Sequence, residues 1–133
     1  MDITLITGAP CSGKTQLAKS LAGPEDIIID ADLIAQALGS HDSHNHPGHV
    51  KALAAALRDV ATNEVIRLGH KAFIVSASPT AETSIPHTEV MHCDPGMAAC
   101  LERAKSRPSW TREAIRKYYT AREKAFTPAR PQW

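Results

Sequence analysis

Short apolar runs alternate along the chain with stretches of helical character. Four runs are rich in β-branched and aliphatic residues and are bounded by turn-forming or acidic residues, a pattern typical of buried parallel strands. They cover residues 3–7, 26–30, 72–76 and 88–93, and the last is the weakest. The chain therefore alternates between segments that predict strands and segments that predict helices.

Helical patterns fill most of the sequence between and after these strands. The predicted helices cover residues 15–22, 31–38, 50–68, 97–105 and 110 to about 125. Seven apolar residues fall near one face of the longest helix, as expected for a helix that packs one side on a core. They are Val50, Leu53, Ala54, Leu57, Val60, Ala61 and Leu68. Gly69 is expected to end this helix, and we expect the tail, residues 127–133, to be extended.

This order predicts an α/β domain. A strand, a helix and a second strand within about thirty residues form a βαβ unit with a right-handed crossover. We expect one three-layer domain over residues 1–133, with about four mostly parallel strands flanked by helices. Ligands of such sheets bind beyond the carboxyl ends of the strands, so the residues at these ends are expected around one crevice. These residues are Thr7, Asp30, Asp32, Ser76, Ser78, Cys93 and Asp94.

Composition narrows the class of protein. The 133 residues fit one domain, 43% are hydrophobic and 22% are charged, as in ordinary soluble domains. The net charge of +1 gives no excess that would favour nucleic acid or a membrane surface. No apolar run is long enough for a membrane span, and no signal peptide is recognised. Three cysteines without metal-like spacing favour a reducing cytoplasm.

The strongest chemical signal is residues 8–15, which read G-A-P-C-S-G-K-T and which we call the glycine loop. They match G-x-x-x-x-G-K-[ST] between a predicted strand and a predicted helix, the context that this motif requires. Such a loop turns its N–H groups inward on an anion, in front of the positive end of the helix. Lys14 would reach the β- and γ-phosphates and Thr15 would ligate Mg²⁺. The predicted nucleotide-binding residues are Gly8, Ala9, Pro10, Cys11, Ser12, Gly13, Lys14, Thr15 and Gln16.

Two aspartates, Asp30 and Asp32, stand at the end of the second predicted strand. Residues two apart on an extended stretch face the same way, so both can approach the crevice. A carboxylate here can accept the proton of an attacking hydroxyl or hold Mg²⁺ through water. The alternative is that either aspartate caps the helix that follows.

Four arginines flank Pro108. Arg103 and Arg107 are spaced one helical turn apart, and Arg112 and Arg116 repeat this spacing beyond the proline. A guanidinium that closes over a transferring phosphoryl group stabilises its charge, and two helices joined by a break suit a lid. The alternative is a solvated basic face with ion pairs to Glu102, Glu113 or Glu123.

Taken together, these features resemble the P-loop kinase superfamily, especially small polynucleotide, nucleoside and nucleotide kinases. The chain also resembles small bacteriophage ATP-binding proteins that carry a segment rich in histidine and proline, here residues 44–47. The resemblance implies a P-loop NTPase fold with an acceptor-side insert at about 40–58 and a helical lid at about 103–112. It also implies transfer of the γ-phosphoryl group of ATP, with Mg²⁺, to a hydroxyl of a nucleoside, nucleotide or nucleic acid.

The resemblance further assigns roles to individual residues. The catalytic set is Lys14, Asp32, Arg103 and Arg107, where Asp32 matches the catalytic aspartate and the arginines match the lid. The two arginines also contact the nucleotide, and the magnesium set is Thr15, Asp30 and Asp32. Polynucleotide 5′-kinases carry an arginine three residues after the aspartate, where this chain has Ala35. No carboxylate follows the third strand, so Mg²⁺ would depend on Thr15, water, and Asp30 or Asp32.

Several alternatives remain open in the sequence. Four histidines, His41, His44, His46 and His49, lie within nine positions and suit a zinc site, acceptor recognition or an ordinary loop. Cys11 would suit a phosphatase nucleophile, but Leu17 stands where that chemistry needs an arginine. An ATP-binding accessory protein with slow or no hydrolysis is the alternative to an enzyme, and a kinase specific for DNA or RNA is a third reading.

Overall fold

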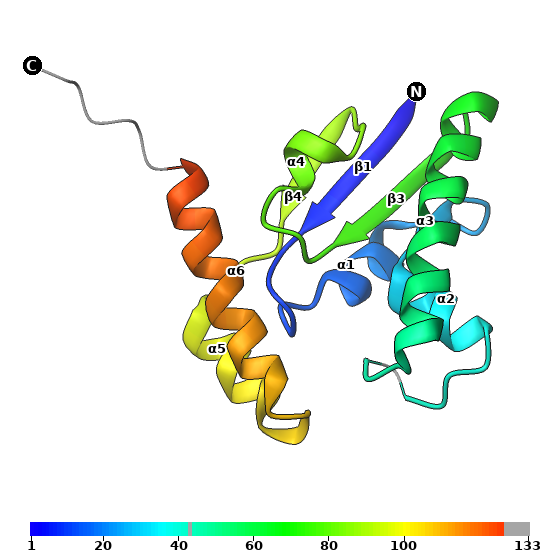
Figure 1. Ribbon diagram of the computed structural model, residues 1–133. Coiled ribbons are helices and arrows are strands. Elements are labelled where there is room, and N and C mark those ends of the chain that lie inside the picture. The colour runs from blue at the N-terminus through cyan, green and yellow to red at the C-terminus, as the bar shows by residue number, and fades with distance from the viewer. Residues whose placement is uncertain (43, 127–133) are drawn as a thin grey trace, which may run out of the picture.

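The computed structural model describes residues 1–42 and 44–126, so the predicted extended tail lies outside the described residues. Within them, four strands form one sheet in the order β2-β3-β1-β4 (Figure 1). They are β1 (Asp2–Thr7), β2 (Ile27–Ile29), β3 (Lys71–Ser76) and β4 (Glu89–His92). Every neighbouring pair is parallel, which confirms the predicted α/β sheet.

The central strands β1 and β3 carry the core. They pair along their whole length, from Asp2 with Lys71 to Thr7 with Ser76. Helices cover both faces, so successive residues are buried on opposite sides and the strands read as continuous apolar runs. β2 is shorter than predicted because the acids at both ends bond elsewhere: Asp26 accepts from the N–H of Gly23, and Asp30 caps the next helix.

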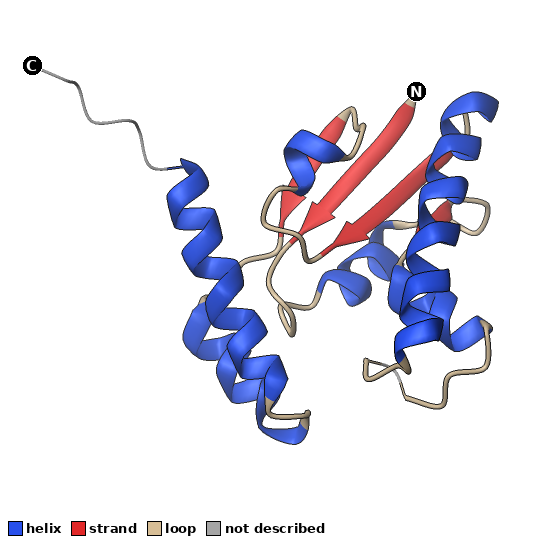
Figure 2. Cartoon of the chain, viewed as in Figure 1, coloured by secondary structure: helices blue, strands red, loops and turns tan. Residues whose placement is uncertain are grey.

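The helices form the outer layers (Figure 2). The main helices are α1 (Lys14–Leu21), α2 (Ala31–Ala37), α3 (Gly48–Leu68), α5 (Met97–Arg103) and α6 (Trp110–Phe126), and α4 (Ala81–Ser84) is a single turn. α1 packs through Ala18 on Ile6, Phe73 and Val75 of the sheet. α3 and α4 pack through Val65 and Ala81 on the opposite face, against Ile3, Leu5 and Ile74. The sheet is therefore flanked by helices on both faces, as predicted.

The predicted apolar face of α3 is wrong in most of its positions. Leu53, Leu57, Val60 and Leu68 are 37–58% exposed, whereas Ala54, Thr62 and Val65 are buried. Two apolar stripes run along this helix, one with the leucines and one with Ala54 and Val65. Only the stripe with the smaller side chains packs against the rest of the protein. α3 contacts α2 as well as β2 and β3, and these neighbours leave the leucines uncovered.

The helix predicted at residues 97–105 ends earlier, at Arg103, and continues as a 3-10 turn, Ala104–Ser106. Arg107 is extended, with φ −112° and ψ 166°. The cause is Pro108, whose ring disfavours the helical conformation for the residue before it. Arg103 and Arg107 therefore do not share one helix face, and this part of the lid prediction is wrong.

Candidate functional site

The glycine loop joins β1 to α1 and has the backbone of a tight turn. Cys11 and Gly13 adopt left-handed conformations, with φ of 65° and 96°. A Cβ atom on Gly8 would lie 2.5 Å from the carbonyl oxygen of Cys93 and 2.5 Å from Oγ of Ser12. Only glycine fits this position without a shift, so the loop is packed tightly against the segment that follows β4.

Three features of the loop fit an anion. Ser12 is 4% exposed, and within the described chain its hydroxyl has no hydrogen-bond partner. Nζ of Lys14 donates to the carbonyl oxygen of Ala9 at 2.7 Å, so the ammonium group lies over the loop. No side chain in the described residues caps the amino-terminal end of α1. An unpartnered hydroxyl, a lysine and an open helix end are the groups that bind phosphate.

Burial affects the charge on Lys14. Removal from water lowers the pKa of this lysine below its ordinary value, and the negative charge of Asp30 partly opposes the shift. This ammonium group is partly removed from water and bonds a carbonyl oxygen rather than an anion, so a bound anion would stabilise it.

Asp30 and Asp32 have separate positions. Asp30 is 4% exposed, accepts a hydrogen bond from the Thr15 hydroxyl at 2.5 Å and accepts another from the N–H of Asp32 at 2.9 Å. It is the cap of α2, which begins at Ala31, so the capping interpretation is confirmed for Asp30. The side chain of Asp32 remains 44% exposed and can meet a ligand.

Thr15 and Asp30 have the chemistry of a magnesium site, since Mg²⁺ prefers one or two carboxylates, water and substrate phosphates. Their hydroxyl and carboxylate oxygens already lie in contact. Residues 1–42 and 44–126 hold no group of three or more His, Cys, Asp or Glu side chains placed to bind a metal. The residues therefore fit Mg²⁺ held together with a nucleotide better than a metal held by protein ligands alone.

The histidine segment folds onto Asp32, which the sequence did not predict. Nε2 of His46 lies 2.9 Å from Oδ1 of Asp32, and Nδ1 of His44 lies 3.4 Å from Oδ2. Oγ of Ser40 lies 2.6 Å from Nδ1 of His46, whose side chain is only 3% exposed. The other two histidines of the segment, His41 and His49, are exposed. In the sequence, the signal for this contact is an aspartate followed by a segment rich in histidine. The spacing of apolar residues predicts helices and strands but not a contact of this kind.

One lid arginine reaches the glycine loop. Nη1 of Arg103 donates to the carbonyl oxygen of Cys11 at 3.1 Å. Arg107 is half-buried on the turn before Pro108, while Arg112 and Arg116 are exposed on α6. The acids expected to pair with arginines, Glu102 and Glu113, instead form ion pairs with Lys105 and Lys117.

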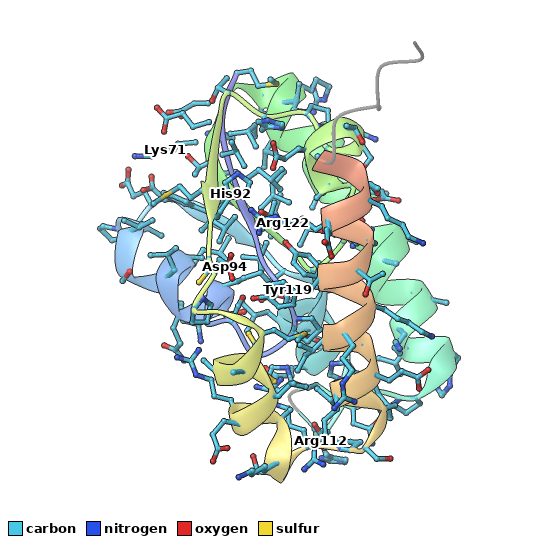
Figure 3. All side chains as sticks on the ribbon, turned by 90° about the vertical axis from the view of Figure 1, so that its left-hand side faces the viewer. Lys71, His92, Asp94, Arg112, Tyr119 and Arg122 are labelled. Atoms are coloured by element: carbon cyan, nitrogen blue, oxygen red, sulfur yellow. The ribbon has the colours of Figure 1, made fainter. Side chains whose placement is uncertain are left out.

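Polar contacts hold α6 against the end of β4 (Figure 3). The Tyr119 hydroxyl donates to Oδ1 of Asp94 at 2.6 Å, and Nη1 of Arg122 lies 3.9 Å from Oδ2. The bond from Tyr119 lowers the pKa of Asp94, while burial raises the pKa of Tyr119. His92 contacts Thr7 at 3.0 Å and Glu82 at 3.2 Å. Arg112 lies at the other end of α6, away from this cluster.

The strand-end residues do not surround one crevice as predicted, but lie in separate groups. Thr7 and Ser78 line one small cavity together with His92 and Tyr118. Asp30 instead contacts Thr15. The α5–α6 pair lies on one side of the strand ends and α2 with α3 on the other (Figure 1). A contact between α3 and α6 joins the two sides: Nζ of Lys51 lies 5.5 Å from the ring centre of Trp110.

Comparison with known proteins identifies the fold. No protein-family model matches the chain, and no curated protein matches it in sequence. The chain is similar to one from the structure of the Pnkp1/Rnl/Hen1 RNA repair complex, with a TM-score of 0.67 and 14% sequence identity. The match covers 92% of this chain but only 44% of the other, so the chain spans less than half the length of that neighbour. The likeness shows a shared α/β fold. In the described residues, no helix has the length and apolar character needed to cross a membrane.

Proposed function

We propose that the protein is a P-loop kinase that moves the γ-phosphoryl group of ATP to a hydroxyl of a nucleoside, nucleotide or nucleic acid. One observation carries the proposal: Asp30 joins the glycine loop to the Asp32 turn, and Arg103 contacts the same loop. The Thr15–Asp30 distance is 2.5 Å and the Arg103–Cys11 distance is 3.1 Å. A donor loop, an accessible carboxylate and an arginine at one end of a sheet are the parts that phosphoryl transfer needs.

The glycine loop would bind the donor. Its N–H groups and the Ser12 hydroxyl would bond phosphate oxygens, and Lys14 would leave the carbonyl of Ala9 for the β- and γ-phosphates. Thr15 and Asp30 would hold Mg²⁺, directly or through water. When bound, Mg²⁺ neutralises charge on the β- and γ-phosphate oxygens.

Asp32 would act on the acceptor. Its carboxylate takes the proton of the acceptor hydroxyl while the hydroxyl oxygen forms a bond to the γ-phosphorus. The bond from the γ-phosphorus to the bridging oxygen breaks, and ADP leaves with that electron pair. The proton then passes from Asp32 to solvent. The 44% exposure of this side chain leaves room for the acceptor.

Arg103 would stabilise the transferring group. Its guanidinium has five N–H donors, and in the described part of the chain one of them bonds the carbonyl of Cys11, so donors remain for equatorial phosphoryl oxygens. Arg107 stands on the turn between α5 and α6 and would approach only when the lid closes. We therefore expect replacement of Arg103 and replacement of Arg107 to impair transfer differently, because Arg103 already lies at the glycine loop.

The acceptor is proposed by class. The similar structure belongs to an RNA repair complex, so RNA ends join nucleosides and nucleotides in the set to be tested. Ala35 is buried where polynucleotide 5′-kinases carry an arginine, which favours an acceptor held without that phosphate contact. All three cysteines are free, and we propose a cytoplasmic location on this basis.

The test measures ADP release from ATP–Mg²⁺ with adenosine, thymidine, nucleoside monophosphates and 5′-hydroxyl RNA and DNA oligomers. We expect one acceptor class to stimulate release. Asp32→Asn should abolish the stimulated turnover while ATP affinity stays nearly unchanged, and Lys14→Ala should weaken ATP binding itself. Asp59→Asn, on an aspartate that is 72% exposed on α3, is the matched control and should behave as wild type. Tight ATP binding without stimulation by any acceptor would indicate an accessory protein instead.

A further inference from the structure

The Asp32 carboxylate is the last member of a short chain of hydrogen-bonded polar side chains. Oγ of Ser40 lies 2.6 Å from Nδ1 of His46, and Nε2 of His46 lies 2.9 Å from Oδ1 of Asp32. The three residues come from the first turn of α2 and from the segment that joins α2 to α3. Asp42 shapes this segment by accepting hydrogen bonds from the N–H groups of His44 and Asn45, at 2.8 and 2.9 Å.

The direction of the bond to Asp32 follows from its partners. A carboxylate only accepts, so the proton on Nε2 of His46 is donated to Asp32. Nδ1 shares a hydrogen bond with the Ser40 hydroxyl, which can act as donor or acceptor. Both ring nitrogens are thereby satisfied in a side chain that is 3% exposed, as a buried polar group requires.

The two oxygens of Asp32 differ as a result. Oδ1 is engaged by the buried His46. Among residues 1–42 and 44–126, the partner of Oδ2 is Nδ1 of His44 at 3.4 Å, longer than a usual N–H···O bond. The His44 side chain is 37% exposed and can move aside. Oδ2 is therefore the oxygen left to receive a proton from an acceptor.

We infer that His46 is the positioning residue of Asp32, which fixes the carboxylate so that Oδ2 faces the acceptor hydroxyl. This inference rests on the proposed phosphoryl transfer. It gives the histidine segment a role in the reaction that is neither metal binding nor direct contact with the acceptor. Misplacement of a reacting group by about 1 Å can cost about 100-fold in rate, so loss of this support should appear in kcat.

Replacement of His46 by glutamine or by asparagine distinguishes the contact with Asp32 from the contact with Ser40. The side-chain nitrogen of glutamine reaches about as far as Nε2 of histidine and can donate to Asp32. The nitrogen of asparagine lies closer to the position of Nδ1 and can reach only Ser40. His46→Gln should therefore keep most of the turnover, whereas His46→Asn and His46→Ala should lose it.

The experiment measures kcat and KM for full-length wild type and the three His46 variants, with ATP–Mg²⁺ and the acceptor that gives the highest wild-type rate in the set above. We expect His46→Ala and His46→Asn to lower kcat by about 10- to 100-fold with ATP affinity close to wild type. Both variants remove buried contacts and should also lower the unfolding midpoint, so rates are compared at a temperature where every variant is folded. His46→Gln should lie within about threefold of wild type, on the same reasoning that its donor is retained.

The outcomes separate the two proposals. A wild-type chain that transfers to no acceptor overturns the proposed function, and the role of His46 with it. An active wild type matched by all three variants overturns the role of His46 alone. Recovery by asparagine but not glutamine also overturns it, since the Ser40 contact would then be the important one. Covalent labelling of Ser40 by a fluorophosphonate would assign a serine nucleophile and would equally overturn the inference.

Discussion

Replacement of Gly8 by alanine tests whether the glycine loop is packed against the segment after β4. The added methyl would meet the carbonyl oxygen of Cys93 and Oγ of Ser12, both at 2.5 Å. Real Cβ contacts are not this short, so the loop or the segment at Cys93 must shift. Overpacking of this kind costs about 1–3 kcal/mol of the free energy of unfolding.

The matched control is Gly48→Ala at the start of α3. No atom lies within 4 Å of a Cβ atom there, and its φ is not positive. Alanine should therefore be neutral or should stabilise the chain by about 0.4–1 kcal/mol, because it restricts the unfolded chain. The difference between the two variants isolates the steric contact from the general effect of replacing glycine.

Urea unfolding followed by circular dichroism measures both variants. We expect a lower midpoint for Gly8→Ala at an unchanged slope, and a weaker affinity for ATP because the loop backbone has moved. Equal midpoints for the two variants would refute the packing argument. A changed slope would instead report altered compactness of one state.

Three further predictions concern charge and packing. Because burial lowers the pKa of Lys14, the free energy of unfolding of the nucleotide-free chain should rise as the pH increases from that lowered pKa toward 10.5. Lys14→Met should remove this rise, and equal profiles of unfolding free energy against pH for wild type and variant would contradict the prediction. Tyr119→Phe should cost about 0.5–1.5 kcal/mol and reduce the loss of stability as the pH falls through the lowered pKa of Asp94, a loss that begins near 3.8. On α3, Val60→Ser, on a residue 58% exposed, should change stability by less than about 0.5 kcal/mol, whereas Val65→Ala, on a residue 5% exposed, should cost about 1–3 kcal/mol. The reverse order for Val60 and Val65 would restore the predicted apolar face.

The sequence predicted the order of strands and helices because that order depends on local patterns. A buried parallel strand is a nearly continuous run of aliphatic and β-branched residues, so residues 3–7 and 72–76 were recognisable without knowledge of their neighbours. The glycine loop was recognisable for a similar reason, since its spacing and its flanks lie within one short segment.

Contacts between distant segments were not predictable in this way. The leucine and the alanine–valine stripes of α3 have the same period, and only the position of the sheet selects between them. His46 reaches Asp32 because Ser40 and Asp42 shape the segment between α2 and α3, a geometry with no sequence period. The extended conformation of Arg107 could have been predicted from the sequence, however, because the residue before a proline avoids the helical region.

The most direct test of the central claim follows the label from γ-³²P-labelled ATP in single turnover, with wild type and Asp32→Asn and with the acceptor set used for ADP release. We predict that wild type forms one labelled acceptor for each ADP, and that Asp32→Asn binds ATP but forms almost none. Release of the label only as free phosphate, or equal transfer by Asp32→Asn, would contradict the assignment of this site to phosphoryl transfer.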